Sequence, residues 1–529
     1  MSQPLFEAFP YGLERLVALI AEGSYHKSEE EIRDKRHVAY LESYLKHIEP
    51  KTLVVERQYV DRDFLEDFAA YYVRCFPRYE KTCTRVHFFR NPFSQKELAE
   101  CLGGEERTLS AEMMRAGYLG FMVIKPLPQT VIGRTCLTTY EETATRYFPA
   151  ARASEFGANL FGIHLPIPRT LPFQEQDSVV AACATSALWT VFQATAREFQ
   201  HQLLSPIEIT KAATHLLPTE TRVIPNRGLS KQMMAHAIKS VNLEPFLICV
   251  SEAYLLQAAI YSYVHARIPL ILGVALADGT SDDDLAPMGM HALAVAGYSL
   301  DGAPKPITAS GLLLRASRMD KIYVHDDQIG PFARMELLNG SVTVKEAGGH
   351  TYVANTALAT SWPSSANNGR VRAIPDMLLV PLYHKLRISW EWALLRVTEI
   401  NAFLTQLTSA LHVLKLSSLE WDVYVTSVNE VRREMRTSGT VDPGKRFAAV
   451  TRPMPRFIWR ATALREGLPV IDVLFDATDV DTADALVQAL VYDEFALNLV
   501  KELARAGDIN KLPFPKSVRR FVSWVNEHS

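Results

Sequence analysis

Four side chains in the middle of the chain have the types and the order that thiol chemistry requires. Gln176 lies in a polar loop, and Cys183 follows it at the start of an apolar helical run. His291 opens an apolar strand, and Asp326 closes another one. A thiolate is a strong nucleophile, an imidazole can take its proton, and a carboxylate can orient the imidazole. These residue types predict attack by Cys183 on a carbonyl group, with His291 as the base.

The position of Cys183 at a helix start favours this chemistry. The first N–H groups of a helix are unpaired and partly positive, so they stabilise a thiolate. The oxyanion formed on attack needs hydrogen-bond donors, which the Gln176 side chain and the backbone N–H of Cys183 supply. Gln174 is the alternative donor, nine positions before the cysteine.

Two adjacent acids compete for the orienting role. Successive side chains of a strand point to opposite faces, so Asp326 shares a face with Ile322 and Val324. That apolar face suits a sheet side covered by the helix of the cysteine, with Asp326 at its end. Asp327 is typical of a turn residue, and His325 points to the other face. We expect Asp326 to orient His291.

The elements that must hold these residues follow an order of helices first and strands afterwards. This order predicts an α+β fold with a mostly antiparallel sheet. His291 comes after a stretch rich in acids and glycine, 279–289, which predicts a loop and places the histidine at a mouth. The expected helices start at Cys183 and cover Ser205 to about Leu216, Lys231–Ser240 and Glu252 to about Arg267, and the expected strands cover Pro245–Val250, Pro269–Leu276, His291–Tyr298, Leu312–Arg315 and Lys321–Asp326.

Two regions of mixed α/β pattern flank this central part. The stretch Pro166–Pro172 holds three prolines, which a helix interior or a central strand does not tolerate, so it predicts a linker. We therefore divide the chain into 1–166, 167–345 and 346–529. In the flanks, the patterns predict helices near Leu13–Ile20, from about Arg387 to Leu404, at Ala483–Leu490 and at Glu494–Ala506, and strands at Tyr118–Ile124, Arg456–Ala461 and Val470–Phe475.

The central region resembles the papain-like cysteine peptidases, and most closely their C39-like branch of bacterial proteins. The resemblance rests on Gln176-Asp177, on Cys183 followed by small residues and Ala187-Leu188, and on the apolar strand from His291 to Tyr298. It implies a papain-like domain at 167–345 that hydrolyses a peptide or other amide bond through an acyl-enzyme. The chain has seven positions from glutamine to cysteine where the family usually has six, and Ala184 stands where the family often has glycine.

The composition of the chain indicates which kinds of partner and cofactor it does not bind. The net charge is -3, and the basic clusters are interspersed with acids, so we expect no nucleic-acid binding. The six cysteines form no CxxC pair and no glycine-rich phosphate loop is present, so we expect neither a metal nor a cofactor. No signal peptide and no apolar run of membrane length is found, so we expect a cytoplasmic protein with free thiols.

Other functions fit the same residues. Transfer of the acyl group to an amine instead of water, as in a transglutaminase-like acyltransferase, needs the same thiol and histidine. A catalytically silent papain-like scaffold is another interpretation, in which the flanking regions bind a protein partner. The sequence leaves these alternatives open beside the peptidase.

Overall fold

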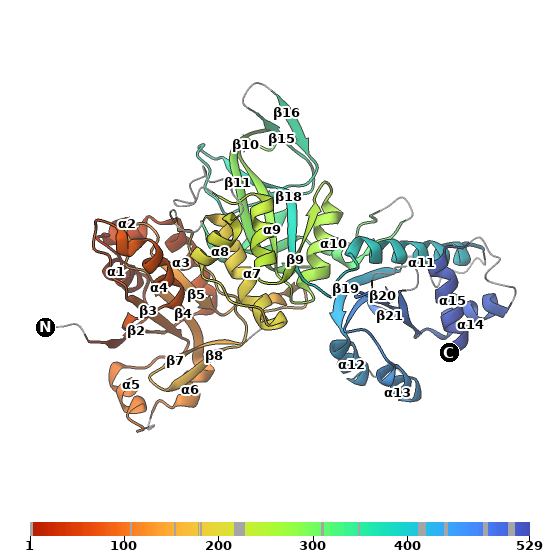
Figure 1. Ribbon diagram of the computed structural model, residues 1–529, viewed down its shortest axis with the longest axis horizontal. Coiled ribbons are helices and arrows are strands. Elements are labelled where there is room, and N and C mark those ends of the chain that lie inside the picture. Colours follow the sequence, from red (N-terminus) through yellow and green to blue (C-terminus); the bar gives the residue numbers. More distant parts are fainter. Residues whose placement is uncertain are drawn as a thin grey trace. The chain divides into compact units, whose positions relative to one another are not determined.

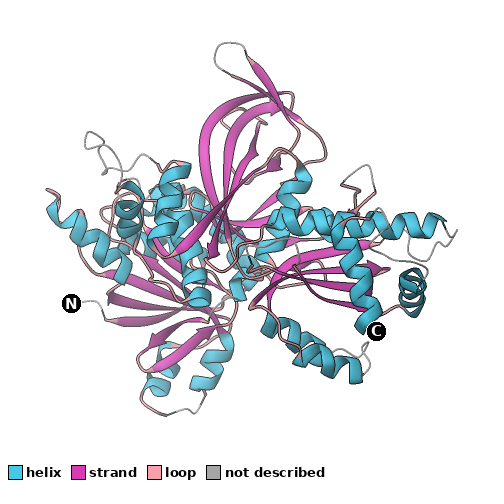
Figure 2. Ribbon diagram, turned by 45° about the vertical axis from the view of Figure 1, so that its right-hand side comes forward, coloured by secondary structure: helices cyan, strands magenta, loops and turns pink. Residues whose placement is uncertain are grey.

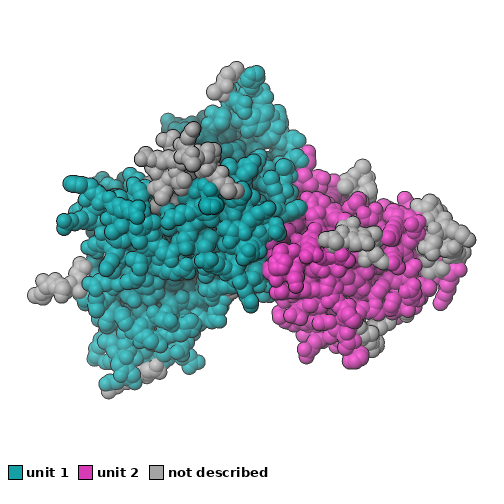
Figure 3. All heavy atoms as spheres, viewed as in Figure 1, with its two compact units in different colours: residues 1–251, 267–298, 321–381 teal, residues 252–266, 299–320, 382–529 magenta. Residues whose placement is uncertain are grey.

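The chain is a mixed α+β protein, as its order of helical and strand patterns predicts (Figure 1). Its residues form two compact units, which Figure 3 shows in different colours. Unit 1 contains 1–251, 267–298 and 321–381, and unit 2 contains 252–266, 299–320 and 382–529. The computed structural model describes residues 4–105, 108–152, 155–177, 179, 182–215, 228–307, 311–346, 350–410, 419–437, 443–479, 485–505 and 514–528. No helix within these ranges is long and apolar enough to cross a membrane.

The N-terminal part of unit 1 is built on an antiparallel sheet in which strands β1 to β5 follow one another in chain order. Two predictions are confirmed here, since the helical spacing after Leu13 forms α1 and the apolar run Tyr118–Ile124 forms the fully buried β4. The elements are β1 (Phe6–Pro10), α1 (Leu13–Gly23), α2 (Glu29–Arg33), α3 (Arg36–Ile48), β2 (Thr52–Tyr59), α4 (Arg62–Ala70), β3 (Cys83–Phe89), α5 (Gln95–Leu102), α6 (Ala111–Gly117), β4, β5 (Ile132–Leu137), β6 (Arg146–Tyr147), β7 (Phe156–Leu160) and β8 (Ile163–Ile167).

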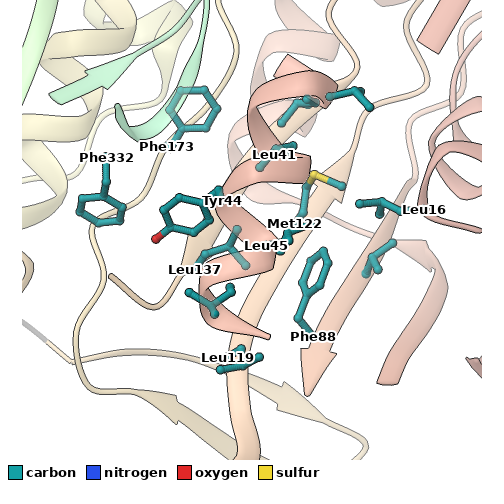
Figure 4. Packing of buried hydrophobic residues seen from close by; sticks show 14 of the residues in the cluster. Leu16, Leu41, Tyr44, Leu45, Phe88, Leu119, Met122, Leu137, Phe173 and Phe332 are labelled. Carbon is teal, nitrogen blue, oxygen red and sulfur yellow. The ribbon is translucent and has the colours of Figure 1, made fainter. Parts of the chain in front are cut away.

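Helix α3 connects this sheet to the strands around Asp326. Its Tyr44 and Leu45 are buried in one apolar cluster with Met122 of β4 and Phe332 of β14 (Gly330–Leu337). Figure 4 shows the side chains of α3 between those of the N-terminal sheet and the ring of Phe332. The N-terminal part therefore shares a core with the strands near Asp326, and the start of α3 is fixed close to them.

The helices expected after the proline-rich stretch are present. Helix α7 (Cys183–Phe199) begins at Cys183, as predicted, and α9 (Lys231–Ser240) has the predicted bounds. Helix α8 (Pro206–Thr214) starts with the predicted capping box, in which Ser205 and Glu208 bond to each other's backbone N–H. Its predicted end near Leu216 lies outside the described residues.

The central sheet of unit 1 follows the order β10-β18-β17-β14-β13-β11-β15-β16. Figure 2 shows the strands of the protein in magenta and its helices in cyan. Strand β10 pairs antiparallel with β11 and β18, and β14 pairs antiparallel with β13 and β17, whereas β15 pairs parallel with β11. These pairings agree with the predicted mostly antiparallel sheet. Strand β13 has the predicted bounds. The strands are β9 (Leu243–Cys249), β10 (Leu270–Ser281), β11 (Asp284–Ser299), β13 (Lys321–Asp326), β14, β15 (Val342–Lys345), β16 (Thr351–Ala354), β17 (Leu358–Ala359) and β18 (Arg370–Tyr383).

The predicted loop at 279–289 is wrong. Strands β10 and β11 continue as a hairpin through this stretch, with Leu276 opposite Gly289 and Ser281 opposite Asp284. The ladder contains two register shifts, and such bulges let glycine and aspartate remain in a strand despite their low strand propensity. His291 therefore lies inside a long strand instead of at its start.

Unit 2 has its own sheet, in which β12, β19, β20, β21 and β22 are neighbours in this order. The predicted strands in 456–475 are present as β20 and β21, and the two predicted helices near Arg387 and Glu494 are present as α11 and α14. The elements are α10 (Ala253–Val264), β12 (Leu313–Leu314), α11 (Trp390–Ala410), β19 (Glu420–Ser427), α12 (Val428–Thr437), α13 (Pro443–Thr451), β20 (Phe457–Arg465), β21 (Leu468–Asp476), β22 (Leu486–Val491), α14 (Glu494–Arg505) and α15 (Lys516–His528).

The helix predicted at Ala483–Leu490 is wrong where the structure describes it. Residues Leu486–Val491 form β22, which pairs antiparallel with β21 from Phe475 to Ile471. A short apolar run fits a buried strand as well as a helix, and here the free edge of β21 decides between them.

The compact units do not follow contiguous stretches of the chain. Strands β17 and β18 lie beyond residue 345 in sequence, yet they pair within the central sheet. Residues 252–266 and 299–320 lie inside the predicted central region, yet they belong to unit 2. The division of the chain at residues 166 and 345 stays a prediction. The two compact units divide the chain differently, because each unit contains several separate stretches of sequence.

Candidate active site

Cys183 is the first residue of α7, and its side chain is partly exposed, whereas the residues that follow it on the helix are buried. The residue before it, Ala182, accepts from the N–H groups of Thr185 and Ser186 through its backbone but has no side chain that could cap the helix. The amide of Cys183 is therefore at the uncapped, partly positive end of the helix, where it can stabilise an anion.

His291 joins the thiol to two carboxylates. Its Nε2 lies 3.0 Å from Oδ1 of Asp326 and 3.6 Å from Oδ1 of Asp327, and the ring also forms a side-chain hydrogen bond with Cys183. Because Nε2 faces the acids, Nδ1 is the nitrogen left for the thiol. Burial alone would lower the pKa of His291, but the two carboxylates and these hydrogen bonds raise it well above its ordinary value. A cationic imidazole is the partner that a thiolate needs.

Asp326 is the acid that is held most firmly. Its Oδ1 accepts from His291 and from the backbone N–H of Gln328 at 3.0 Å, and its Oδ2 accepts from the indole N–H of Trp362 at 2.7 Å. Burial would raise the pKa of Asp326, but the charge of His291 and these hydrogen bonds hold it below its ordinary value. Asp326 is therefore an anion in a fixed orientation, as an orienting acid must be.

Asp327 is also buried beside His291, which the sequence did not predict. Strand β13 ends at Asp326 and the chain turns at once toward Gly330, so the two neighbouring side chains no longer point to opposite faces. Burial raises the pKa of Asp327 to about 7, against the attraction of His291. Asp327 therefore changes between its protonated and its ionised form near neutral pH, whereas Asp326 stays ionised.

Gln176 is brought to the same turn. Its backbone N–H donates to the carbonyl of Asp327 at 3.4 Å, and its side-chain oxygen accepts from the Gln328 amide at 2.9 Å. This contact leaves the Gln176 NH₂ group as a donor for an incoming oxygen. The alternative donor, Gln174, is buried next to Phe173, which forms a bridge with Thr135 of β5.

Residues of the N-terminal part of unit 1 bind two segments of the site, the turn at Asp327 and the loop that contains Gln176. His37 of α3 donates from Nε2 to the carbonyl of Asp327 at 2.8 Å. Glu175, the neighbour of Gln176, accepts from Lys35 at 2.7 Å and from the backbone N–H of Ile132 at 3.0 Å. The turn of the acids and the loop of the glutamine are thus fixed by residues that are distant in sequence: His37 lies 290 positions from Asp327, and Lys35 lies 140 positions from Glu175.

Trp362, which the sequence analysis missed, lies between β17 and β18. Besides its bond to Asp326, its ring meets the His291 ring edge-on at 5.2 Å between centroids. Ser364 and Ser365 donate to Asp278 of β10, which fixes this loop against the sheet. An aromatic residue in a turn-rich stretch is the only sequence signal for it, and that signal is weak.

His325 and the cysteines other than Cys183 differ from the site residues in their surroundings. Among the described residues, neither ring nitrogen of the buried His325 has a hydrogen-bond partner. Burial lowers the pKa of His325 to about 3, so the ring is neutral. Burial raises the pKa of the Cys83 and Cys136 thiols, whereas Cys249 is exposed. Among the cysteines in the described residues, a hydrogen bond to a histidine is found at Cys183.

The same acids offer ligand atoms for a metal ion. His291, Asp326 and Asp327 each have one such atom within 4.8 Å of the others. A metal would have to replace the hydrogen bond between Nε2 and Asp326, because these two atoms would become its ligands. The expected absence of a metal stays a prediction.

Comparison with known proteins adds no identification. No protein-family model matches the chain, and no curated protein is significantly similar to it.

Proposed function

We propose that this protein is a papain-like cysteine hydrolase that cleaves peptide or related amide bonds through an acyl-enzyme on Cys183. One observation carries the proposal: Cys183, at an uncapped helix start, bonds to His291, whose other nitrogen lies 3.0 Å from a buried Asp326. This is the order of nucleophile, base and orienting acid that thiol catalysis needs. The resemblance of the Gln176, Cys183 and His291 segments to the C39-like branch supports the same function.

The reaction follows from the contacts. The Cys183 thiolate attacks the carbonyl carbon, while the Gln176 NH₂ and the Cys183 N–H donate to the oxyanion. The C–N bond then breaks as His291 gives its proton to the leaving amine, and a thioester remains. Water next gives a proton to His291 while its oxygen attacks the thioester, and the C–S bond breaks to restore the thiolate. Asp326 stabilises the imidazolium and keeps its ring in place throughout.

Two alternatives share the site. An amine in place of water in the second step would give acyl transfer, with the same groups and the same proton movements. A silent scaffold would keep the arrangement without turnover. The raised pKa of His291 and the partly exposed Cys183 favour a reactive ion pair over a silent scaffold. Between the two reactions we favour hydrolysis because of the resemblance to the C39-like peptidases. A peptide or protein substrate, and a cytoplasmic location, are parts of the same proposal.

A diverse peptide library separates these functions. Wild type, Cys183→Ala and Cys249→Ala are each incubated with the library, and mass spectrometry records cleaved peptides and newly joined amines. Cys249 is the matched control because it is an exposed cysteine outside the site. We expect cleavage by wild type and Cys249→Ala and none by Cys183→Ala.

Each other outcome contradicts part of the proposal. Joined amines without cleavage identify an acyltransferase, and no product from any variant supports the scaffold. Cleavage that survives Cys183→Ala excludes the nucleophile. Cleavage that EDTA abolishes shows a reaction that depends on a metal ion, for which His291, Asp326 and Asp327 are the candidate ligands.

A further inference from the structure

Arg36 is an exposed arginine at the edge of the site. It is the first residue of α3, its side chain is exposed, and its guanidinium lies 5.5 Å from the centre of the Trp362 ring. The same ring bonds to Asp326 and meets His291. One aromatic ring therefore lies between this cation and the catalytic pair.

Two basic residues close to Arg36 in sequence already form ion pairs. Arg33 pairs with Glu14, and Lys35 pairs with Glu175. Within the described part of the chain, Arg36 forms no ion pair or hydrogen bond, and its contact is the Trp362 ring. A cation in the first turn of a helix also opposes the helix dipole, so Arg36 does not stabilise α3. An unpaired guanidinium in this position is available to a ligand.

The chemistry of the proposed reaction indicates which part of a substrate lies near it. The leaving amine takes its proton from His291, so it must lie beside the imidazole during that step. Trp362 touches His291, and Arg36 lies against Trp362. Trp362 and Arg36 therefore follow one another outward from the imidazole that the leaving amine must meet.

We propose that Arg36 is a specificity residue that binds a carboxylate on the leaving amine. The substrate class is then amides in which the residue after the scissile bond is acidic or carries a free carboxyl end. A guanidinium donates two parallel N–H groups to a carboxylate, and its stacking on Trp362 orders it for this contact. This inference rests on the proposed function, because it assumes attack by Cys183.

The first test measures charge selectivity at the thiol without a natural substrate. Wild type, Arg36→Gln and Arg36→Glu are alkylated with iodoacetate or iodoacetamide at low salt, and the rate at the Cys183 peptide is read by mass spectrometry. The iodoacetate-to-iodoacetamide ratio should fall about twofold in Arg36→Gln, the effect of one unit charge acting across roughly 10 Å of water, and further in Arg36→Glu, where the charge is reversed. The Cys249 peptide serves as the internal reference.

Arg33→Gln is the matched control, because Arg33 is a nearby arginine that Glu14 already occupies. The proposal is overturned if the ratio at Cys183 is unchanged in both Arg36 variants, or if Arg33→Gln lowers it as much. A Cys183 that reacts no faster than Cys249 with iodoacetamide is a different result, since it contradicts the proposed function and not the role of Arg36.

The second test uses peptides that the library shows to be cleaved. Pairs that carry Glu or Lys directly after the scissile bond are compared with wild type and Arg36→Glu. The wild type should favour Glu, chiefly through KM, and Arg36→Glu should favour Lys. Pairs with a free or an amidated C-terminus tell a side-chain carboxylate from a terminal one. A loss of rate that is equal for all peptides would assign Arg36 a structural role and reject the proposal.

Discussion

Two buried carboxylates, Asp326 in unit 1 and Asp472 in unit 2, are each held by a cation on a sheet, but of these two only Asp326 has a cation that also contacts a thiol. In unit 2, Asp472 of β21 is fully buried and accepts from Arg460 at 3.0 Å and from Thr462 at 2.9 Å. In unit 1, Asp326 is held as firmly, but its cation is His291. Arginine does not release its proton near neutral pH, whereas an imidazole can give and take one.

The difference shows which feature indicates function. A buried ion pair alone indicates a structural network, since desolvated charges must be paired wherever they lie. The unit 1 pair differs because its base has a second nitrogen, and a thiol at a helix start bonds to that ring. The four predictions that follow test this distinction, from the largest expected effect to the smallest.

Substitutions in the two regions should affect different properties: activity in unit 1 and stability in unit 2. Cys183→Ala should abolish amide hydrolysis with little change in stability, because alanine suits a helix start. Asp472→Asn should instead lower the free energy of unfolding by up to about 3 kcal/mol, because Arg460 then keeps only the half-exposed Glu434 as a counter-charge. Turnover and urea unfolding are measured for both variants. Activity in Cys183→Ala, or a stable Asp472→Asn, would remove the distinction.

Replacing the orienting acid should reduce turnover by roughly 10³–10⁴-fold, because an amide does not stabilise the imidazolium. We expect this for Asp326→Asn and only a mild loss for Asp327→Asn, since Asp327 lies at the longer distance from Nε2, 3.6 Å. Steady-state kinetics on a cleaved peptide checks it. A larger loss for Asp327→Asn would exchange the two roles and leave the pair of Cys183 and His291 intact.

Removing the proposed oxyanion donor should act on turnover more than on binding. Gln176→Ala should cost about 2.7–4 kcal/mol of transition-state stabilisation, seen in kcat with KM nearly constant. Gln174→Ala is the control, because its neighbour Phe173 places it at the bridge to Thr135. If the control loses as much kcat while Gln176→Ala loses none, the donor is Gln174.

The second acid should be visible in the pH dependence of stability. Burial raises the pKa of Asp327 to about 7, so the folded state keeps its proton where the unfolded state has lost it. Its contribution to stability is therefore full at acidic pH and is lost as pH rises from about 4 to 7. Relative to wild type, Asp327→Asn should gain stability over this interval and change no further above it. A constant difference in Tm from pH 4 to 8 would contradict the raised pKa.

Local sequence patterns were enough to predict an element where a capping box or a clear alternation of side chains marks its ends. The Ser205–Glu208 capping box fixes the start of α8, and the alternation in Lys321–Asp326 gives β13 its observed bounds. The short run Leu486–Val491 became a strand because β21 offered it an edge, which no local pattern contains. The hairpin around Gly289 was missed for the same reason.

The candidate site divides in the same way. Cys183, His291, Asp326 and Gln176 were predicted from residue type and order, and the structure brings them together. Their supports were not predicted, since His37 and Trp362 reach the acid turn from distant parts of the chain. Contacts over such separations depend on how the sheets pack, which spacing along one chain does not encode.

The central claim is that Cys183 and His291 form a reactive ion pair, and alkylation tests it most directly. Wild type and His291→Ala are treated with iodoacetamide near pH 6, where ordinary thiols are slow, and each cysteine peptide is quantified. We predict that Cys183 of the wild type reacts much faster than the exposed Cys249, and that His291→Ala removes this advantage. Equal rates at Cys183 in the two proteins, or a Cys183 no faster than Cys249, would contradict the account.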